Sequence, residues 1–191
     1  MKRNPLVIVF SLLLPYFSLL TLSMVFFSND SPFLGQLLEA VFGGNPLLLL
    51  AAFFVYAILT AVLGTVCFVG GLKKEGNPLA LAKTAVILKL LQIPAYVLIF
   101  AFGVLLVLAI FTYPIAFLLF VLDYVSLVLS GFWVLAAGIY AVRQGVFQSK
   151  DEISRLMILQ FVFCADVVAS IVFYKKLKKR LREAGTPSRE A

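Results

Sequence analysis

Two aspartates lie deep inside long apolar stretches of this sequence, and their carboxyls are its clearest candidates for chemistry. Asp123 comes nine residues after Pro114, and Asp166 comes eight residues before Tyr174. A charged group at the middle of a membrane costs about 2.5–3.5 kcal/mol, so a carboxyl there needs a reason. Serines share a helical face with each aspartate through three- and four-residue spacing. These serines are Ser126, Ser130 and Ser170.

The depth of the two aspartates predicts a shared site. If the helices that carry them run antiparallel, both carboxyls lie roughly 12–14 Å below the same membrane surface. Two close carboxyls cannot both ionise cheaply, so one would hold a proton, and the pair could bind a proton or a cation. The alternative is two hydrogen-bonded carboxyls that help helices associate, with bonds worth about 0.6 kcal/mol each.

Basic residues within the apolar stretches are expected near the membrane surface. Lys89 and Arg155 should lie close to the surface opposite the aspartates, too far along the helix axis to neutralise either one. We predict that Pro78–Gln92 is a partly interfacial lead-in, in which Lys83 and Lys89 extend toward the lipid head groups. Pro94 then marks a bend into the deeper part of the helix.

Five long apolar stretches must position these residues, and each has the roughly 20 residues that cross about 30 Å of hydrocarbon. With 63% hydrophobic and 13% charged residues, the chain departs from soluble averages of about 45–50% and 25%. Because each backbone N–H and C=O needs a partner in lipid, such runs predict helices. We therefore predict an all-α, polytopic membrane helical bundle with about five transmembrane helices. The predicted spans are Pro5–Phe27, Pro46–Gly70, Thr84–Phe111, Pro114–Val142 and Ile153–Tyr174.

Local signals add detail at the start of the chain. Pro15 removes a backbone hydrogen bond and should kink the first helix. The connector Ser28–Asn45 carries apolar residues at three- and four-residue spacing. This pattern predicts a short interfacial helix that ends at Gly43–Gly44.

Basic residues gather at the end of the chain. The net charge is +7, and seven of the 16 lysines and arginines follow Tyr174. Beside a membrane helix, such residues fix orientation and contact anionic lipid, at about 1 kcal/mol each, rather than nucleic acid. We predict one transmembrane domain over residues 1–176 and a basic juxtamembrane tail over residues 177–191. The predicted head-group contacts are Lys175, Lys176, Lys178, Lys179, Arg180 and Arg182.

The distribution of these charges conflicts with five crossings. The first and third connectors contain no lysine or arginine, whereas the second and fourth are basic. Because basic loops favour the cytoplasmic side, this pattern alone predicts a cytoplasmic N-terminus, and five crossings then put the basic tail outside. Either the last segment does not cross fully, as a re-entrant or tilted interfacial helix, or the molecule is inverted. The tail cluster favours a cytoplasmic tail and an N-terminus outside.

Metal and redox chemistry find little support in the composition. The sequence has no histidine, and its two cysteines, Cys67 and Cys164, both lie in apolar stretches. Usual zinc and iron sites, and triads that need imidazole, therefore lack their ligands or base. Isolated buried cysteines behave as small hydrophobes. We expect no metal and no cofactor.

Two strings are the most distinctive in the chain: QIPAY at Gln92–Tyr96 and QFVFCADV at Gln160–Val167. With the arrangement of the last three spans, they make the region from Asn77 onward resemble a group of uncharacterised small multi-pass membrane proteins of Gram-positive anaerobic bacteria. The resemblance implies a bacterial cytoplasmic (plasma) membrane and a stand-alone bundle. It implies no activity and no site residues.

The functional prediction is a non-enzymatic accessory or interaction component of the bacterial membrane. Small residues line one face of the second span, at Ala57, Ala61 and Gly64, and of the fourth span, at Ser126, Ser130, Ala137 and Ala141. They favour helix–helix contacts with a second copy or a membrane protein partner, although packing within the molecule explains them equally. The alternative is a small oligomeric transporter or channel that uses Asp123 and Asp166 for a cation or proton. An intramembrane aspartyl protease fits least, because its Tyr-Asp and Gly-x-Gly-Asp contexts are missing. The expected surroundings are the lipid bilayer and anionic head groups, without nucleic acid.

Overall fold

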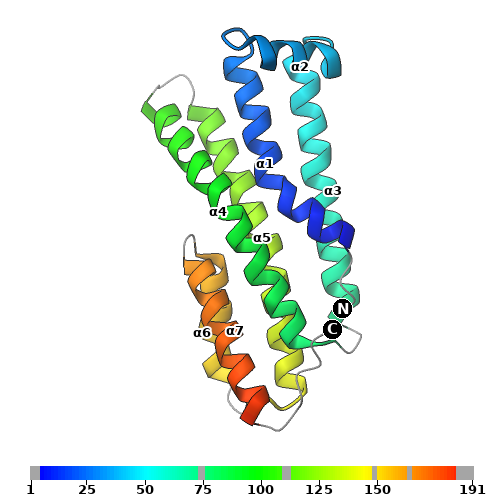
Figure 1. The fold of residues 1–191 in the computed structure, drawn as a ribbon, viewed down its shortest axis with the longest axis vertical. Helices are drawn as coiled ribbons and strands as arrows, with labels where there is room; N and C mark the ends of the chain where they lie inside the picture. Colours follow the sequence, from blue (N-terminus) through cyan, green and yellow to red (C-terminus); the bar gives the residue numbers. More distant parts are fainter. Residues whose placement is uncertain (1–4, 73–75, 109–112, 148–149, 163–164, 184–191) are drawn as a thin grey trace. The chain divides into compact units, whose positions relative to one another are not determined.

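The computed structural model describes residues 5–72, 76–108, 113–147, 150–162 and 165–183, and all the regular secondary structure in these residues is helical (Figure 1). The predicted all-α class is confirmed. Lys73, Lys74 and Cys164 lie outside the described residues. The elements are α1 (Pro5–Phe27), α2 (Pro32–Phe42), α3 (Pro46–Leu72), α4 (Pro78–Leu108), α5 (Tyr113–Arg143), α6 (Lys150–Ile158), the 3₁₀ turn η2 (Leu159–Phe161) and α7 (Ala165–Glu183).

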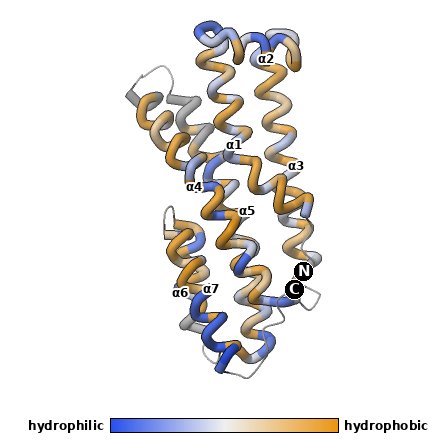
Figure 2. Tube along the Cα trace, in the orientation of Figure 1, coloured by the Kyte–Doolittle hydropathy of each residue, from blue (hydrophilic) through white to orange (hydrophobic). Residues whose placement is uncertain are grey.

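Among the described residues, four helices, and not the predicted five, are long and apolar enough to cross a membrane. Figure 2 shows their apolar character, and the candidate spans are Pro5–Phe27, Pro46–Gly70, Pro78–Leu105 and Asp123–Arg143.

The fifth predicted span, Ile153–Tyr174, is wrong. In its place the chain forms α6, η2 and α7, and α6 and α7 pack against each other as a hairpin (Figure 1). The nine residues of α6 extend about 14 Å, less than half of a bilayer core of about 30 Å. The helix α7 is longer, but its apolar part ends at Tyr174, because Lys175 and the basic residues after it follow. The two antiparallel helices match the re-entrant alternative that the charge pattern left open.

The predicted helix in the first connector is confirmed as α2. It ends where expected, because Gly43 adopts φ 57° and its N–H donates to the Glu39 carbonyl. A left-handed residue at this position is the common helix stop, and glycine adopts it without steric cost. Leu38 of α2 packs with Met24 and Leu49 in a small buried cluster.

The chain divides into two compact units, and each is described by itself. Unit 1 contains residues 1–8, 63–91 and 127–191, which include the end of α3, the start of α4, most of α5 and the α6–α7 hairpin. Unit 2 contains residues 9–62 and 92–126, which include most of α1, all of α2, the start of α3 and the second part of α4.

In unit 1, hydrogen bonds link the end of α5 to the end of α3 and to the start of α4. Arg143, at the end of α5, donates to the Leu72 carbonyl at the end of α3. Gln144 donates to the Gly76 carbonyl just before α4, at 3.2 Å. The end of α3, the start of α4 and the end of α5 therefore lie at one end of unit 1, as antiparallel neighbours require.

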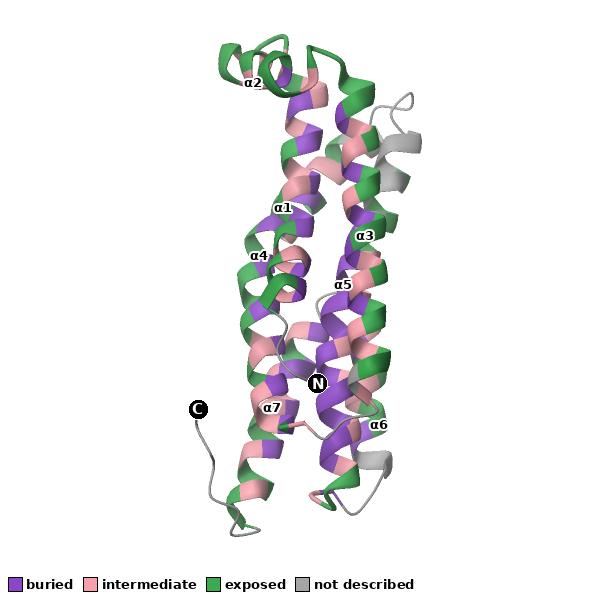
Figure 3. Cartoon of the chain, turned by 90° about the vertical axis from the view of Figure 1, so that its right-hand side faces the viewer, coloured by how far each residue is buried: buried purple, intermediate pink, exposed green. Residues whose placement is uncertain are grey.

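Several small residues of the second and fourth predicted spans pack inside the molecule, which was one of the two explanations for them. In unit 1, a Cβ on Gly64 would come within 2.7 Å of Leu129 Cδ2, so α3 and α5 approach closely there. Ser126, Ser130, Ala137 and Ala141 of α5 are all buried. Figure 3 shows the dense burial of α5, whose span is 67% buried, against 28% for that of α3.

Candidate functional site

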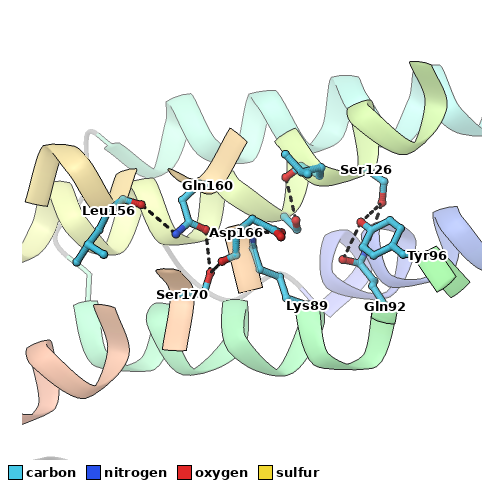
Figure 4. Close-up of polar contacts among 10 residues, drawn as sticks. Lys89, Gln92, Tyr96, Ser126, Leu156, Gln160, Asp166 and Ser170 are labelled. Carbon is cyan, nitrogen blue, oxygen red and sulfur yellow. Dashed lines mark hydrogen bonds and ion pairs between the residues drawn. The ribbon is translucent and has the colours of Figure 1, made fainter. Parts of the chain in front are cut away.

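A buried ion pair joins α4 to α7 in unit 1. Lys89 Nζ donates to Asp166 Oδ2 at 2.7 Å (Figure 4), and the two side chains are 0% and 5% exposed. The prediction that Lys89 extends to the head groups, too far from either aspartate to neutralise it, is wrong. Its reason is the wrong fifth span: because α6 and α7 turn back, Asp166 reaches the level of Lys89. Lys83 is exposed, and the whole of the predicted interfacial lead-in, Pro78–Gln92, falls within the candidate span Pro78–Leu105.

The helix α7 presents Asp166 favourably. Asp166 is in the first turn of α7, where the positive end of the helix dipole stabilises a carboxylate by about 0.3–1 kcal/mol. The buried residues Ala169, Phe173 and Leu177 follow at three- and four-residue spacing. They pack one face of α7 into unit 1, and this packing positions Asp166.

Spacing along the helices places the ion pair well below the ends of unit 1. Lys89 is 12 residues past the helix cap Asn77, which corresponds to about 18 Å along α4. Asp166 is nine residues before Lys175, or about 14 Å along α7. Within a bilayer core of about 30 Å, both values correspond to the middle.

Gln160 in η2 links the two arms of the hairpin. Its Nε2 donates to the Leu156 carbonyl of α6 at 3.1 Å. The Ser170 hydroxyl lies 2.8 Å from Gln160 Oε1 and also 2.8 Å from the Asp166 carbonyl, so it can donate to either (Figure 4). Gln160 is fully buried, and a Cβ on Gly131 of α5 would lie 3.6 Å from its Cβ. The tip of the hairpin therefore sits against α5.

A second polar cluster, in unit 2, surrounds Gln92 of α4. The Tyr96 hydroxyl lies 3.3 Å from Gln92 Oε1 and 3.1 Å from Ser126 Oγ (Figure 4). Gln92 Nε2 donates to the Ser11 carbonyl of α1 at 2.8 Å. Ser11 lies four residues before Pro15, whose missing N–H would otherwise have bonded that carbonyl.

Side chains therefore supply hydrogen bonds at the kink in α1. Figure 1 shows α1 bending part-way along its length, as Pro15 predicts. One residue before Ser11, the Phe10 carbonyl accepts a bond from the Tyr56 hydroxyl at 2.8 Å. In lipid, the Ser11 carbonyl that Pro15 leaves without a helical donor needs a partner such as Gln92, and Tyr56 adds a second contact one residue earlier in α1.

The predicted aspartate pair is split between the two units. Asp166 and Ser170 belong to the ion-pair network of unit 1, and Ser130 donates to the Leu127 carbonyl at 2.9 Å. Asp123 belongs to unit 2, together with Ser126, and it is 6% exposed. Its Oδ1 has no hydrogen-bond partner among the described residues. A joint site of Asp123 and Asp166 stays a prediction.

The predicted head-group contacts lie on one helix. They belong to α7, which continues as a helix to Glu183, so the basic segment is an extension of the hairpin. Five of the six are exposed, the exception being the half-buried Lys178, while Leu177 between them is buried. Figure 2 shows this hydrophilic end of α7.

Sequence reasoning missed the partners of the predicted residues, although a signal was present. Lys89, Gln92 and Tyr96 recur at three- and four-residue spacing, which places them on one face of α4. Polar side chains on one face of an apolar helix indicate a buried polar surface. Both distinctive strings contribute to the clusters, QIPAY through Gln92 and Tyr96, and QFVFCADV through Gln160 and Asp166.

Comparison with known proteins gives one finding. A model described as a family of unknown function, DUF6652, matches residues 6–179. No curated protein and no solved structure matches. The family match agrees with the resemblance to an uncharacterised group, while the bacterial group itself stays a prediction. The matched region includes every residue of both polar clusters.

Proposed function

We propose a function for this chain, which belongs to the family of unknown function DUF6652, from its buried ion pair. The proposal is a non-enzymatic membrane protein that transports protons or small cations through the Lys89–Asp166 pair. One observation carries it: a lysine and an aspartate pair at 2.7 Å inside an apolar helical bundle, with almost no exposure.

Stability alone does not explain such a pair. Replacing a buried ion pair by apolar side chains of similar size is often neutral, or stabilising by about 1–4 kcal/mol. Ionisable residues within membrane segments are costly, and they mark ion pathways and proton relays. The charges of Lys89 and Asp166 are therefore best explained by an activity that uses charge.

The chemistry of the pair suggests how transport would work. The Lys89 ammonium is a tethered cation on the Asp166 carboxylate, so it occupies the position that a mobile cation or proton would take. Exchange requires the pair to separate. Asp166 stands at the start of α7, in a hairpin neither of whose arms is among the candidate membrane spans. Broken helices at membrane depth are the usual framework of ion and substrate sites in transporters.

The second candidate is the accessory component that acts by helix contacts with a membrane protein partner or a second copy. The span of α3 favours it, because this helix has the smallest buried share of the four, 28%. The rest of its apolar surface is open to lipid or to another helix. The burial of the small residues of α5 removes one of the two helix faces on which this candidate was based.

We also propose that the protein resides in a bacterial cytoplasmic membrane with both chain ends on the cytoplasmic side. Four crossings return the chain to the side from which it started. The basic residues Arg143 and those of α7 then face the same side of the membrane, which agrees with the preference of basic segments for the cytoplasm. The earlier preference for an N-terminus outside is thereby replaced.

Flux into liposomes tests the transport proposal. We expect purified wild-type protein to raise the rate of proton, sodium or potassium entry above that of empty vesicles. Asp166→Asn and the double variant Lys89→Met/Asp166→Leu should reduce the rate to that of empty vesicles. Lys83→Met and Glu39→Gln change exposed charges and should leave it unaltered.

Two outcomes contradict the proposal. Flux that persists in the folded double variant would make the pair structural. A wild-type protein that conducts none of the three ions would leave the accessory role as the better candidate. Co-purification of a membrane protein in mild detergent would then be its direct test.

A further inference from the structure

A groove runs between α5 and the α6–η2 segment in unit 1, separate from the ion pair. It has a volume of about 800 Å³. Gly138 forms part of its wall, and the nearest atoms to a Cβ at this position would be the methyl and sulfur of Met157, at 2.9 and 3.1 Å. The groove therefore follows the line along which α6 approaches α5.

The lining is apolar except at one end. The side chains of Leu135, Ile139 and Val142 contribute from α5, and those of Ile153 and Met157 from α6. The two polar side chains in the lining are Arg143 and Ser154. Because α5 ends where α6 begins, both stand at the same end of the groove.

The direction of the groove matches that of a lipid in a bilayer. Leu135 and Arg143 are eight residues apart, which gives an apolar length of about 12 Å along α5. Arg143 closes the span of α5, so it lies at the level of the head groups. At the other end, Ile158 and Val162 are 66% and 49% exposed. The groove thus opens toward the hydrocarbon.

We propose that this groove binds one anionic phospholipid, with an acyl chain along α5 and the phosphate at Arg143. A guanidinium binds phosphate through two parallel charge-assisted hydrogen bonds. Arg143 gives one of its donors to the Leu72 carbonyl, and this contact holds the side chain at the mouth of the groove. Arg155, which is next to Ser154 on α6 and is exposed, adds positive charge nearby.

Native mass spectrometry of the full chain in mild detergent tests the proposal. The probes are phosphatidylglycerol and phosphatidylcholine with identical acyl chains. We expect one bound lipid per chain, with phosphatidylglycerol bound about tenfold more tightly, as one charge-assisted contact implies. Ile139→Trp fills the groove and should abolish the binding of both lipids. Ile58→Trp is the matched control, because Ile58 is exposed on α3.

A second pair of variants tests the role of charge. Arg143→Gln should remove the preference for phosphatidylglycerol, whereas Lys83→Gln, at an exposed position of α4 outside the groove, should keep it. Thermal melting establishes that each variant is folded. Unchanged binding in folded Ile139→Trp, an equal effect of Arg143→Gln and Lys83→Gln, or a second polypeptide bound in place of lipid would each overturn the proposal.

Discussion

At the scale of single residues, Lys89 and Asp166 depend on each other. Lys89→Met leaves the Asp166 carboxylate buried without its partner, and we expect the free energy of unfolding to fall by about 3–5 kcal/mol. Lys89→Met/Asp166→Leu removes both charges and should recover most of this loss. The single tryptophan, Trp133, is 2% exposed and belongs to unit 1, so its fluorescence reports the melting of this unit in detergent.

The matched control for this pair lies on the same helix. Lys83 is exposed, so Lys83→Met should change the melting temperature little. If Lys89→Met behaves like Lys83→Met, or if the double variant is as unstable as the single one, the pair does not contribute to stability in the way described.

Gln92 and Pro15 are also coupled. Gln92→Leu deprives the Ser11 carbonyl of its partner, which should cost about 1–3 kcal/mol. In a Pro15→Ala background, the N–H of residue 15 can donate to that carbonyl, so the same substitution should cost at least about 1 kcal/mol less. The contacts of Gln92 with Ser126 and Tyr96 are lost in both backgrounds, so they cancel. Unfolding followed by circular dichroism measures both costs, and equal costs would contradict the coupling.

At the scale of elements, local signals predicted α2 and four of the apolar helices, although several boundaries differ. For α2, a few neighbouring residues determine the helix: the apolar spacing predicts it, and Gly43 and Gly44 predict its end. The same holds for Asn77, whose Oδ1 accepts the N–H groups of Leu79 and Ala80 at 3.0 and 3.2 Å, as a helix cap does. Such elements are specified by their own sequence.

The α6–α7 hairpin could not be predicted in the same way. By length and apolar content alone, Ile153–Tyr174 resembles a membrane span. These two properties do not show whether the chain turns within the stretch. The hairpin is distinguished by a tertiary contact, the ion pair of Asp166 with Lys89, which lies 77 residues earlier in the chain. One feature argued against a simple crossing: this predicted span had the most polar content, at Arg155, Gln160 and Asp166. Both aspartates are buried, and the pairing of Asp166 with Lys89 depends on this turn.

At the scale of the whole molecule, the number of crossings decides which connectors share a side. With four crossings and a hairpin, Gln144 after α5 and Lys179 on α7 face the same side of the membrane, and Gln36 on α2 faces the other. With five crossings, Gln144 and Lys179 would be on opposite sides. All three residues are exposed, so they are suitable sites for labelling.

Single cysteines at these positions test the topology, after both native cysteines are replaced by alanine. In sealed right-side-out vesicles, a membrane-impermeant maleimide should label Gln36→Cys and leave Gln144→Cys and Lys179→Cys unlabelled until detergent is added. The basic residues give the reason, because they keep the ends of α5 and α7 on the cytoplasmic side. Labelling of Lys179→Cys without labelling of Gln144→Cys would restore the fifth crossing. The hairpin, and with it the buried position of Asp166 beside Lys89, would then be wrong.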